Sequence, residues 1–90
     1  MHYWGITKSG RVFKSSQPTV PEPIILWDEQ AGDHRIATEF IGHDLNNGLS
    51  DPVLFRTSIW AGNECVMQDI YFSYEDAQQS HKEYLKQYRN

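Results

Sequence analysis

The residues best suited to chemistry are the adjacent pair His43 and Asp44, together with His81 much later in the chain. Imidazole and carboxylate groups serve as metal ligands and as general acids or bases. A metal site needs three or four ligands that converge, whereas adjacent residues at the end of a strand point to opposite sides. We therefore interpret Asp44 as a loop cap and His43 as a solvated side chain. The pattern predicts no metal, no cofactor and no catalytic residue.

His81 lies on the apolar face of an expected helix. Such a histidine is typically half-buried, with a hydrogen bond to a backbone carbonyl or, in this chain, to Asp44 across the sheet. Because imidazole titrates near neutral pH, His81 is also the best pH-sensitive group if it lies at an interface. Cys65 has no basic neighbour in the sequence that would favour the thiolate, so we expect a buried, inert thiol.

Arg35 and Arg56 lie on neighbouring expected strands. A guanidinium on an open sheet face can pair with a ligand phosphate. Cross-strand pairing with Glu39 is the alternative interpretation. The aromatic residues, among them three tryptophans and five tyrosines, could form a stacking platform, but most of them alternate on strands and are expected to build the core. No nucleophile-elbow, zinc-protease, Walker or Rossmann pattern is present.

The clearest element that positions these groups is a helix over residues 74–89. Ser73 is a good N-cap, and Asp76 follows three residues later as a short-armed capping box. Acidic residues begin the segment and basic residues end it, which complements the helix dipole. The expected buried face consists of Ala77, His81, Tyr84, Leu85 and Tyr88.

Period-two alternation separated by turn residues predicts strands before the helix. We expect turns at 8–11, 29–34 and 61–64, a proline-rich connector over 16–23, and a long loop over 43–52. The expected strands are residues 2–7, 12–15, 24–28, 35–42, 53–60 and 65–72.

Consecutive strands followed by a helix predict an α+β fold. We expect one domain over residues 1–90, an antiparallel sheet of about four to six strands, and the C-terminal helix packed on one face. The other face would keep apolar residues such as Ile24, Leu26 or their alternates. A half-covered sheet in so short a chain predicts a homodimer or larger homo-oligomer.

Composition narrows the possible functions. The 90 residues carry a formal net charge of −4, so a protein that grips nucleic-acid phosphates is not expected. Met1 to Trp4 lacks the basic and apolar regions of a signal peptide, and no apolar run approaches a membrane span. The single cysteine fits a reducing compartment. We therefore expect a cytoplasmic protein without membrane contact.

Three runs carry a resemblance to a known group: F-I-G-H-D-L-N-N over 40–47, D-P-V-L-F-R-T-S-I-W over 51–60, and I-Y-F-S-Y-E-D-A-Q-Q-S-H over 70–81. They resemble small uncharacterised proteins encoded by bacteriophages, prophages and other mobile elements. That pattern reads L-G-L-D-H-N-F, then P-L-L-F-E-T-M-V-F-G-G, then R-Y-x-T-x-E-E-A-x-x-G-H. The matching positions are Gly42, Asp44, Asn46, Pro52, Leu54, Phe55, Thr57, Tyr71, Glu75, Ala77 and His81.

The resemblance spans about residues 34–85 and implies a small α+β domain from a mobile element, with no implied chemistry. Three positions depart from the pattern: Leu45 replaces its histidine, Arg56 its glutamate and Ser80 its glycine. If the replaced histidine and glutamate belong to a working site in the group, part of that site is missing here.

Together these patterns favour a non-enzymatic accessory protein of a phage or other mobile element. It would act through an oligomeric cleft or a sheet surface on a host protein or a small nucleotide-like ligand. The alternatives are a small enzyme that uses Asp44, His43 and His81, and an interaction protein with no ligand pocket. The candidate ligand-binding residues are His43, Asp44, Asn46, Arg56 and His81.

Overall fold

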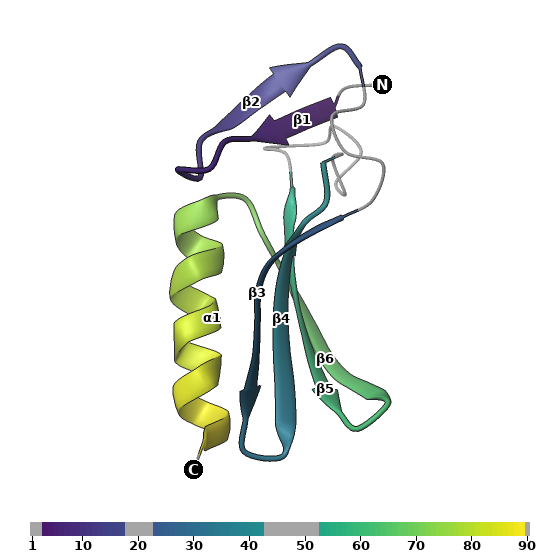
Figure 1. Cartoon of the computed structure of the whole chain (residues 1–90), viewed down its shortest axis with the longest axis vertical. Helices are drawn as coiled ribbons and strands as arrows, with labels where there is room; N and C mark the ends of the chain where they lie inside the picture. Colours follow the sequence, from purple (N-terminus) through teal and green to yellow (C-terminus); the bar gives the residue numbers. More distant parts are fainter. Residues whose placement is uncertain (1–2, 18–22, 43–52, 90) are drawn as a thin grey trace.

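A computed structural model describes residues 3–17, 23–42 and 53–89. They form an α+β fold in which the C-terminal helix packs on one face of an antiparallel sheet, as predicted (Figure 1). The six described strands are divided between a four-stranded and a two-stranded sheet. In chain order the elements are β1 (Tyr3–Ile6), β2 (Val12–Ser15), β3 (Ile24–Ala31), β4 (His34–Phe40), β5 (Phe55–Ala61), β6 (Glu64–Tyr71) and α1 (Tyr74–Arg89).

Helix α1 has the predicted bounds and the predicted cap. The Asp76 N–H donates to Ser73 Oγ at 3.1 Å, which satisfies one of the free donors of the first turn. Ala77, His81 and Leu85 are buried, so the predicted apolar stripe is the face that packs on the sheet. Helix α1 lies mainly beside β3 and β4 (Figure 1).

The larger sheet, called sheet B here, has the strand order β3-β4-β5-β6, and all its neighbours are antiparallel. Two hairpins build it, each closed by a two-residue turn that begins with a glycine of positive φ: Gly32 at 60° and Gly62 at 63°. The turn predicted over 29–34 is too long. Gly32 supplies the conformation that closes a hairpin in two residues, and β3 therefore continues to Ala31.

The core lies between α1 and sheet B, and it has two parts. Towards the two hairpin turns it consists of Ala31, Ile36, Ile59 and Leu85. Towards the start of the helix it consists of Phe40, Leu54, Phe55 and Ala77.

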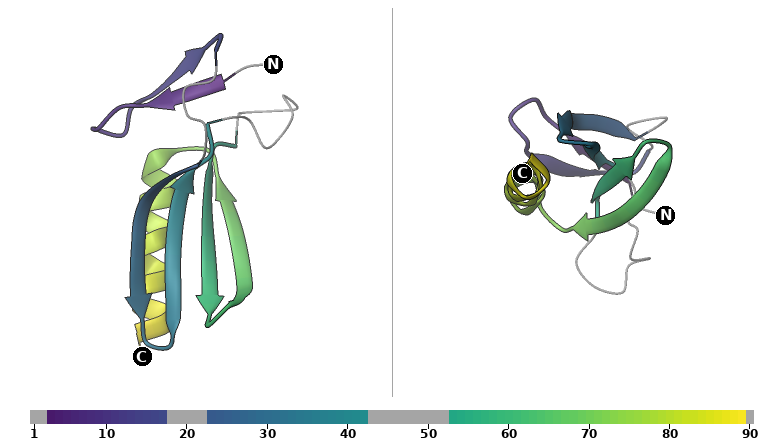
Figure 2. Two further views of the ribbon diagram at one scale, coloured as in Figure 1. Left: turned by 45° about the vertical axis from the view of Figure 1, so that its right-hand side comes forward. Right: turned by 90° about the horizontal axis from the view of Figure 1, so that it is seen from below.

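The hairpin formed by β1 and β2 closes the helix-start end of this core. Trp4, Ile6 and Val12 pack against the part of the core that contains Phe40 and Phe55. The Trp4 N–H also donates to the Gly42 carbonyl at 2.9 Å, which ties the hairpin to the end of β4. Figure 2 shows this small sheet lying across the end of sheet B.

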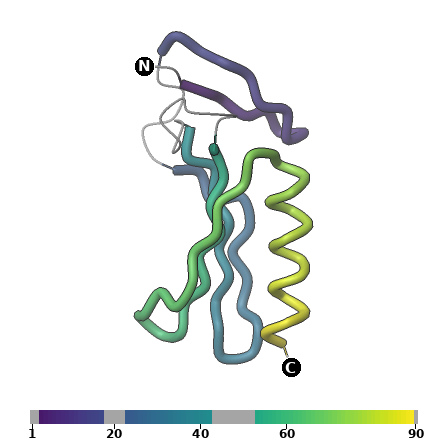
Figure 3. Tube along the Cα trace, turned by 180° about the vertical axis from the view of Figure 1, so that it is seen from behind, coloured from purple at the N-terminus to yellow at the C-terminus, as the bar shows by residue number. Residues whose placement is uncertain are grey.

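The second face of sheet B is called the open face here, because no described element packs on it (Figure 2). The hairpin of β5 and β6 also turns away from α1, so that its tip stands clear of the helix in opposite views (Figures 1 and 3). Exposed apolar residues are therefore found on β6, among them Ile70 on the open face. Ile25, next to the predicted Ile24 and Leu26, is the most exposed apolar residue of β3.

Candidate functional site

The chemically richest feature of the fold is a chain of hydrogen bonds between α1 and sheet B. The His81 Nε2 lies 3.0 Å from Glu29 Oε1, and its Nδ1 lies 2.8 Å from the Thr38 hydroxyl. The Thr38 and Thr57 hydroxyls are 2.7 Å apart. A neutral imidazole with its proton on Nε2 fits this chain: Thr57 donates to Thr38, Thr38 to His81, and His81 to Glu29.

Carboxylate, imidazole and hydroxyl in this order resemble the arrangement that activates a nucleophile. The hydroxyls, however, are the innermost groups of the protein: Thr38 is 0% exposed and Thr57 1%. Trp27 covers the imidazole from the side, with ring centroids 5.6 Å apart. Because a substrate has no path to either hydroxyl, the arrangement stabilises the helix–sheet interface and offers no nucleophile to solvent.

A second polar cluster joins β6 to α1. Asp69 Oδ2 accepts hydrogen bonds from the Tyr71 hydroxyl at 3.0 Å and the Tyr84 hydroxyl at 3.1 Å. Burial raises the pKa of Tyr71, and burial followed by the interaction with Tyr71 and Asp69 raises the pKa of Tyr84. Both phenols therefore stay protonated and act as donors. The bond from Tyr84 joins α1 to β6, whereas the bond from Tyr71 lies within β6.

The open face carries two arginine–carboxylate pairs. Arg35 donates from Nε to Asp28 Oδ1 at 2.7 Å and from Nη2 to Asp28 Oδ2 at 2.9 Å. These hydrogen bonds raise the pKa of Arg35. Arg56 donates from Nε to Glu39 Oε1 at 2.8 Å, and its Nη2 contacts the same oxygen. The cross-strand pairing of Arg56 with Glu39 is thus confirmed, and Arg35 pairs with Asp28.

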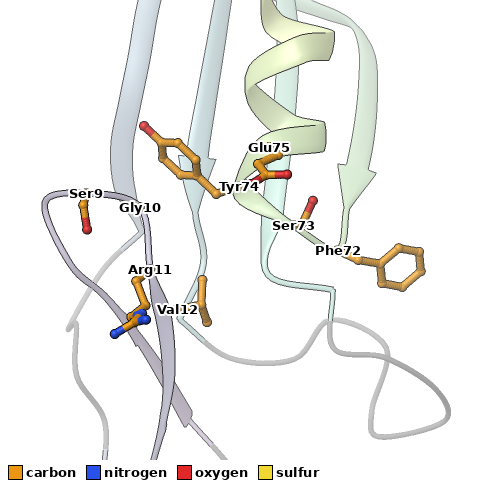
Figure 4. A pocket seen from close by; sticks show the side chains of 8 residues that line it. All are labelled: Ser9, Gly10, Arg11, Val12, Phe72, Ser73, Tyr74 and Glu75. Atoms are coloured by element: carbon orange, nitrogen blue, oxygen red, sulfur yellow. The ribbon is translucent and has the colours of Figure 1, made fainter.

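A hollow of about 510 Å³ lies between the β1–β2 turn and the start of α1. Arg11 and Glu75 bring opposite charges to its lining, while the Ser73 hydroxyl already caps the helix. Figure 4 shows Tyr74 and Phe72 pointing in opposite directions from this segment, with Tyr74 towards the β1–β2 turn. The described lining therefore lacks the convergent polar groups that fix a ligand's orientation.

The five candidate binding residues do not form one site in the described chain. His43, Asp44 and Asn46 lie outside the described residues. Arg56 is on the open face, whereas His81 is on the helix face, so the sheet separates them. His81 is bonded to Glu29 and Thr38, two side chains that were not predicted as its partners. The predicted bond to Asp44 involves a residue outside the described ranges. Within the described ranges, no three His, Cys, Asp or Glu residues are placed to share a metal ion.

Cys65 differs from the expectation of burial. It is half-exposed on β6, and its thiol lies 3.5 Å from the Met67 carbonyl oxygen. The prediction was wrong because the tip of the β5–β6 hairpin extends beyond the cover of α1 (Figure 3).

The sequence indicated some of the hydrogen-bond partners of His81 but not all of them. Thr38 lies between Ile36 and Phe40 at period two, and Thr57 lies between Phe55 and Ile59 in the same way. A hydroxyl at a core position of a strand needs a partner, and a histidine on the packing helix is one. Glu29 had no such signal, because β3 was expected to end before it.

No family model matches this chain, and neither a curated protein nor a solved structure does. In the structure that is described, no helix combines the length and the apolar character needed to cross a bilayer.

Proposed function

We propose that this protein is a non-enzymatic binding module that binds another protein through the open face of sheet B. The row of side chains directly across the four strands carries this proposal: Ile25, Glu39, Arg56 and Ile70 are successive partners in the strand register. Ile25 and Ile70 are 55% and 52% exposed and flank the half-buried ion pair. Apolar anchors beside a partly desolvated arginine are typical of protein-binding surfaces.

The environment of His81, Thr38 and Thr57, the groups most capable of catalysis, also favours a binding role over an enzymatic one. Both nitrogens of the buried His81 are engaged in hydrogen bonds, and Thr38 and Thr57 are closed to solvent. An enzyme that relied on these groups would have to open the helix–sheet interface in every catalytic cycle.

Charge favours a protein partner over a small nucleotide-like ligand. Each arginine of the open face already pairs with a carboxylate, so a phosphate would have to displace Glu39 or Asp28. The net charge of −4 adds an unfavourable long-range field for an anion. By analogy with the mobile-element proteins that the chain resembles, the partner would be a host protein and the chain an accessory protein of a phage or other mobile element.

The test compares wild-type protein with Ile25→Lys and with Gln87→Lys, which adds the same charge on an exposed position of α1. Proteins captured from host lysate by the wild type are identified, purified and titrated against all three chains by calorimetry. We expect Ile25→Lys to bind about tenfold more weakly or worse, and Gln87→Lys to bind like wild type.

Two results would overturn the proposal. One is a partner whose affinity is the same for Ile25→Lys and wild type. The other is native mass spectrometry in which the purified protein carries a nucleotide-sized mass that Arg56→Ala removes, since this would assign the open face to a small ligand.

A further inference from the structure

Strand β6 is one of the two edges of sheet B, and its composition favours pairing with another β-strand. An edge strand presents backbone donors and acceptors that can template another strand, and proteins usually block this with lysine, proline or a short strand. Residues 64–72 contain no lysine, arginine or proline. Four of the exposed large apolar residues of the described chain are gathered there: Val66, Met67, Ile70 and Phe72.

The opposite edge, β3, is protected. Pro23 precedes it, and Asp28 and Glu29 place charges along it. A register shift between Ile25 and Trp27 bends the strand, and α1 lies beside it. Each of these features discourages edge-to-edge pairing. Strand β6 also carries two acidic residues, Glu64 and Asp69, and a register shift, but it has no proline and no described helix beside its free edge. Of the two edges of sheet B, β6 is therefore the better suited to receive another strand.

The backbone of β6 shows which groups face outwards. The Ile70 N–H donates to the side chain of Asp69 at 3.0 Å, so it points away from the β5 ladder. In an antiparallel strand the N–H and C=O of a residue point to the same side, and that side alternates. Gln68 therefore faces outwards as Ile70 does. Val66 lies at the register shift of β6, because Cys65 pairs with Trp60 and Met67 pairs with Ile59, so the alternation is interrupted there.

Outward residues must pair with outward residues, which restricts how two copies of β6 can meet. If the two-fold axis between the two copies passed through Asp69, the two Asp69 carboxylates would face each other. If it passed through Met67, Ile70 would lie opposite Glu64. An axis through Gln68 places Val66 of each copy opposite Ile70 of the other. It also places Asp69 opposite Met67, so no like charges face each other along the strand.

We propose that β6 pairs antiparallel with β6 of a second copy of this chain, with Gln68 on the two-fold axis. The two four-stranded sheets then form one continuous eight-stranded sheet, with both helices on the same side. The Ile70 N–H then exchanges its bond to the Asp69 side chain for a bond to the backbone of the second copy's β6. Because β3 is protected, the pairing stops at the dimer.

The first test is sedimentation equilibrium of the wild type and two matched variants. Ile70→Lys places a charge in the interface, and Ile25→Lys places it at a similarly exposed site on β3. We expect wild type and Ile25→Lys to be dimers and Ile70→Lys to have at least tenfold weaker dimerisation. A wild-type monomer at about 1 mM, or equal dimerisation of both variants, would overturn the proposal.

A cross-linking pair tests the register. In a Cys65→Ser background, Gln68→Cys brings two thiols opposite each other, at a backbone separation of about 5.5 Å that suits a disulfide. Met67→Cys in that background is offset by two residues from its symmetry mate, which is too far. Mild oxidation should cross-link Gln68→Cys alone. Cross-linking of Met67→Cys alone, or of neither variant, would overturn the proposed register.

These results are separate from those for the proposed function. Ile25→Lys is expected to lose the protein partner and keep the dimer. Dimer loss in Ile25→Lys contradicts the β6 interface, and unchanged partner binding in Ile25→Lys contradicts the open-face proposal whatever the oligomeric state is.

Discussion

The Nδ1 of His81 and the hydroxyl of Thr38 lie 2.8 Å apart, and both residues are at least 97% buried. This contact joins the middle of α1 to the second strand of sheet B across 43 positions of the chain. A buried hydrogen bond of this kind contributes a modest net free energy when made, but removal of one partner leaves the other desolvated and unpaired. It fixes the rotation of the helix on the sheet more specifically than apolar contacts would.

The first prediction concerns this contact. His81→Ala removes the acceptor of the buried Thr38 hydroxyl, which keeps only its contact with Thr57, and creates a cavity beside Trp27. We expect the free energy of unfolding to fall by about 3 kcal/mol. Urea denaturation followed by tryptophan fluorescence measures it, with the exposed Lys82→Ala as control. A His81→Ala protein as stable as the control would show that the network is not structural and would return His81 to the candidates for catalysis.

The helix and the order of the strands could be predicted because their signals are local. The Ser73 cap, the apolar spacing and the end charges all fall within or next to α1 itself. Antiparallel hairpins then follow chain order, so the alternating segments suffice to give the sheet.

The partners of each polar side chain could not be predicted in the same way. His81 meets Glu29 and Thr38 only because the strand register and the helix rotation place them together, and neither is encoded in a short window. The extension of β3 to Ala31 could not be predicted for a similar reason. Gly32 could have ended a longer loop, and only pairing with His34 shows that the turn is two residues long.

A second prediction compares the two hairpin glycines. Gly32 and Gly62 have nearly the same φ, but an added Cβ at Gly32 would lie 2.5 Å from the Tyr88 carbonyl oxygen, whereas Gly62 has nothing within 4 Å. Gly62→Ala should therefore lose only about 1 kcal/mol of stability for its positive φ. Gly32→Ala should lose about 1–3 kcal/mol more, because a backbone oxygen must move. Thermal unfolding of both variants provides the measurement, and equal losses would disprove the contact between this turn and the end of α1.

A third prediction concerns the ion pairs of the open face. The Arg56 and Glu39 side chains are 32% and 20% exposed, while those of Arg35 and Asp28 are 50% and 37% exposed. A double-mutant cycle to alanine should give about 1 kcal/mol of coupling for Arg56–Glu39 at low salt. The coupling for Arg35–Asp28 should be smaller and should decrease more steeply with added salt. If the more exposed pair is the more strongly coupled, burial does not set the strength of these pairs.

The last prediction concerns alkaline pH and the cluster of Asp69, Tyr71 and Tyr84. The folded-state pKa of both phenols is raised above the ordinary value of about 10, so folding favours their protonated forms. The stabilisation that this provides is complete below about pH 10 and decreases as the pH rises towards the folded-state pKa values. Tyrosinate absorbance should therefore show Tyr71 and Tyr84 ionising late, until the protein unfolds.

Tyr84→Phe isolates the origin of that decline. It removes the hydrogen bond to Asp69 at 3.1 Å and should lower stability by about 1 kcal/mol at pH 8. Its unfolding midpoint should then fall less steeply above pH 10 than that of wild type, because one raised phenol is gone. Tyr3→Phe, in the β1–β2 hairpin, removes a tyrosine outside the cluster and serves as the control. Equal slopes in all three proteins would show that the alkaline loss of stability arises elsewhere, and that Asp69 does not hold β6 to the helix through the Tyr84 phenol.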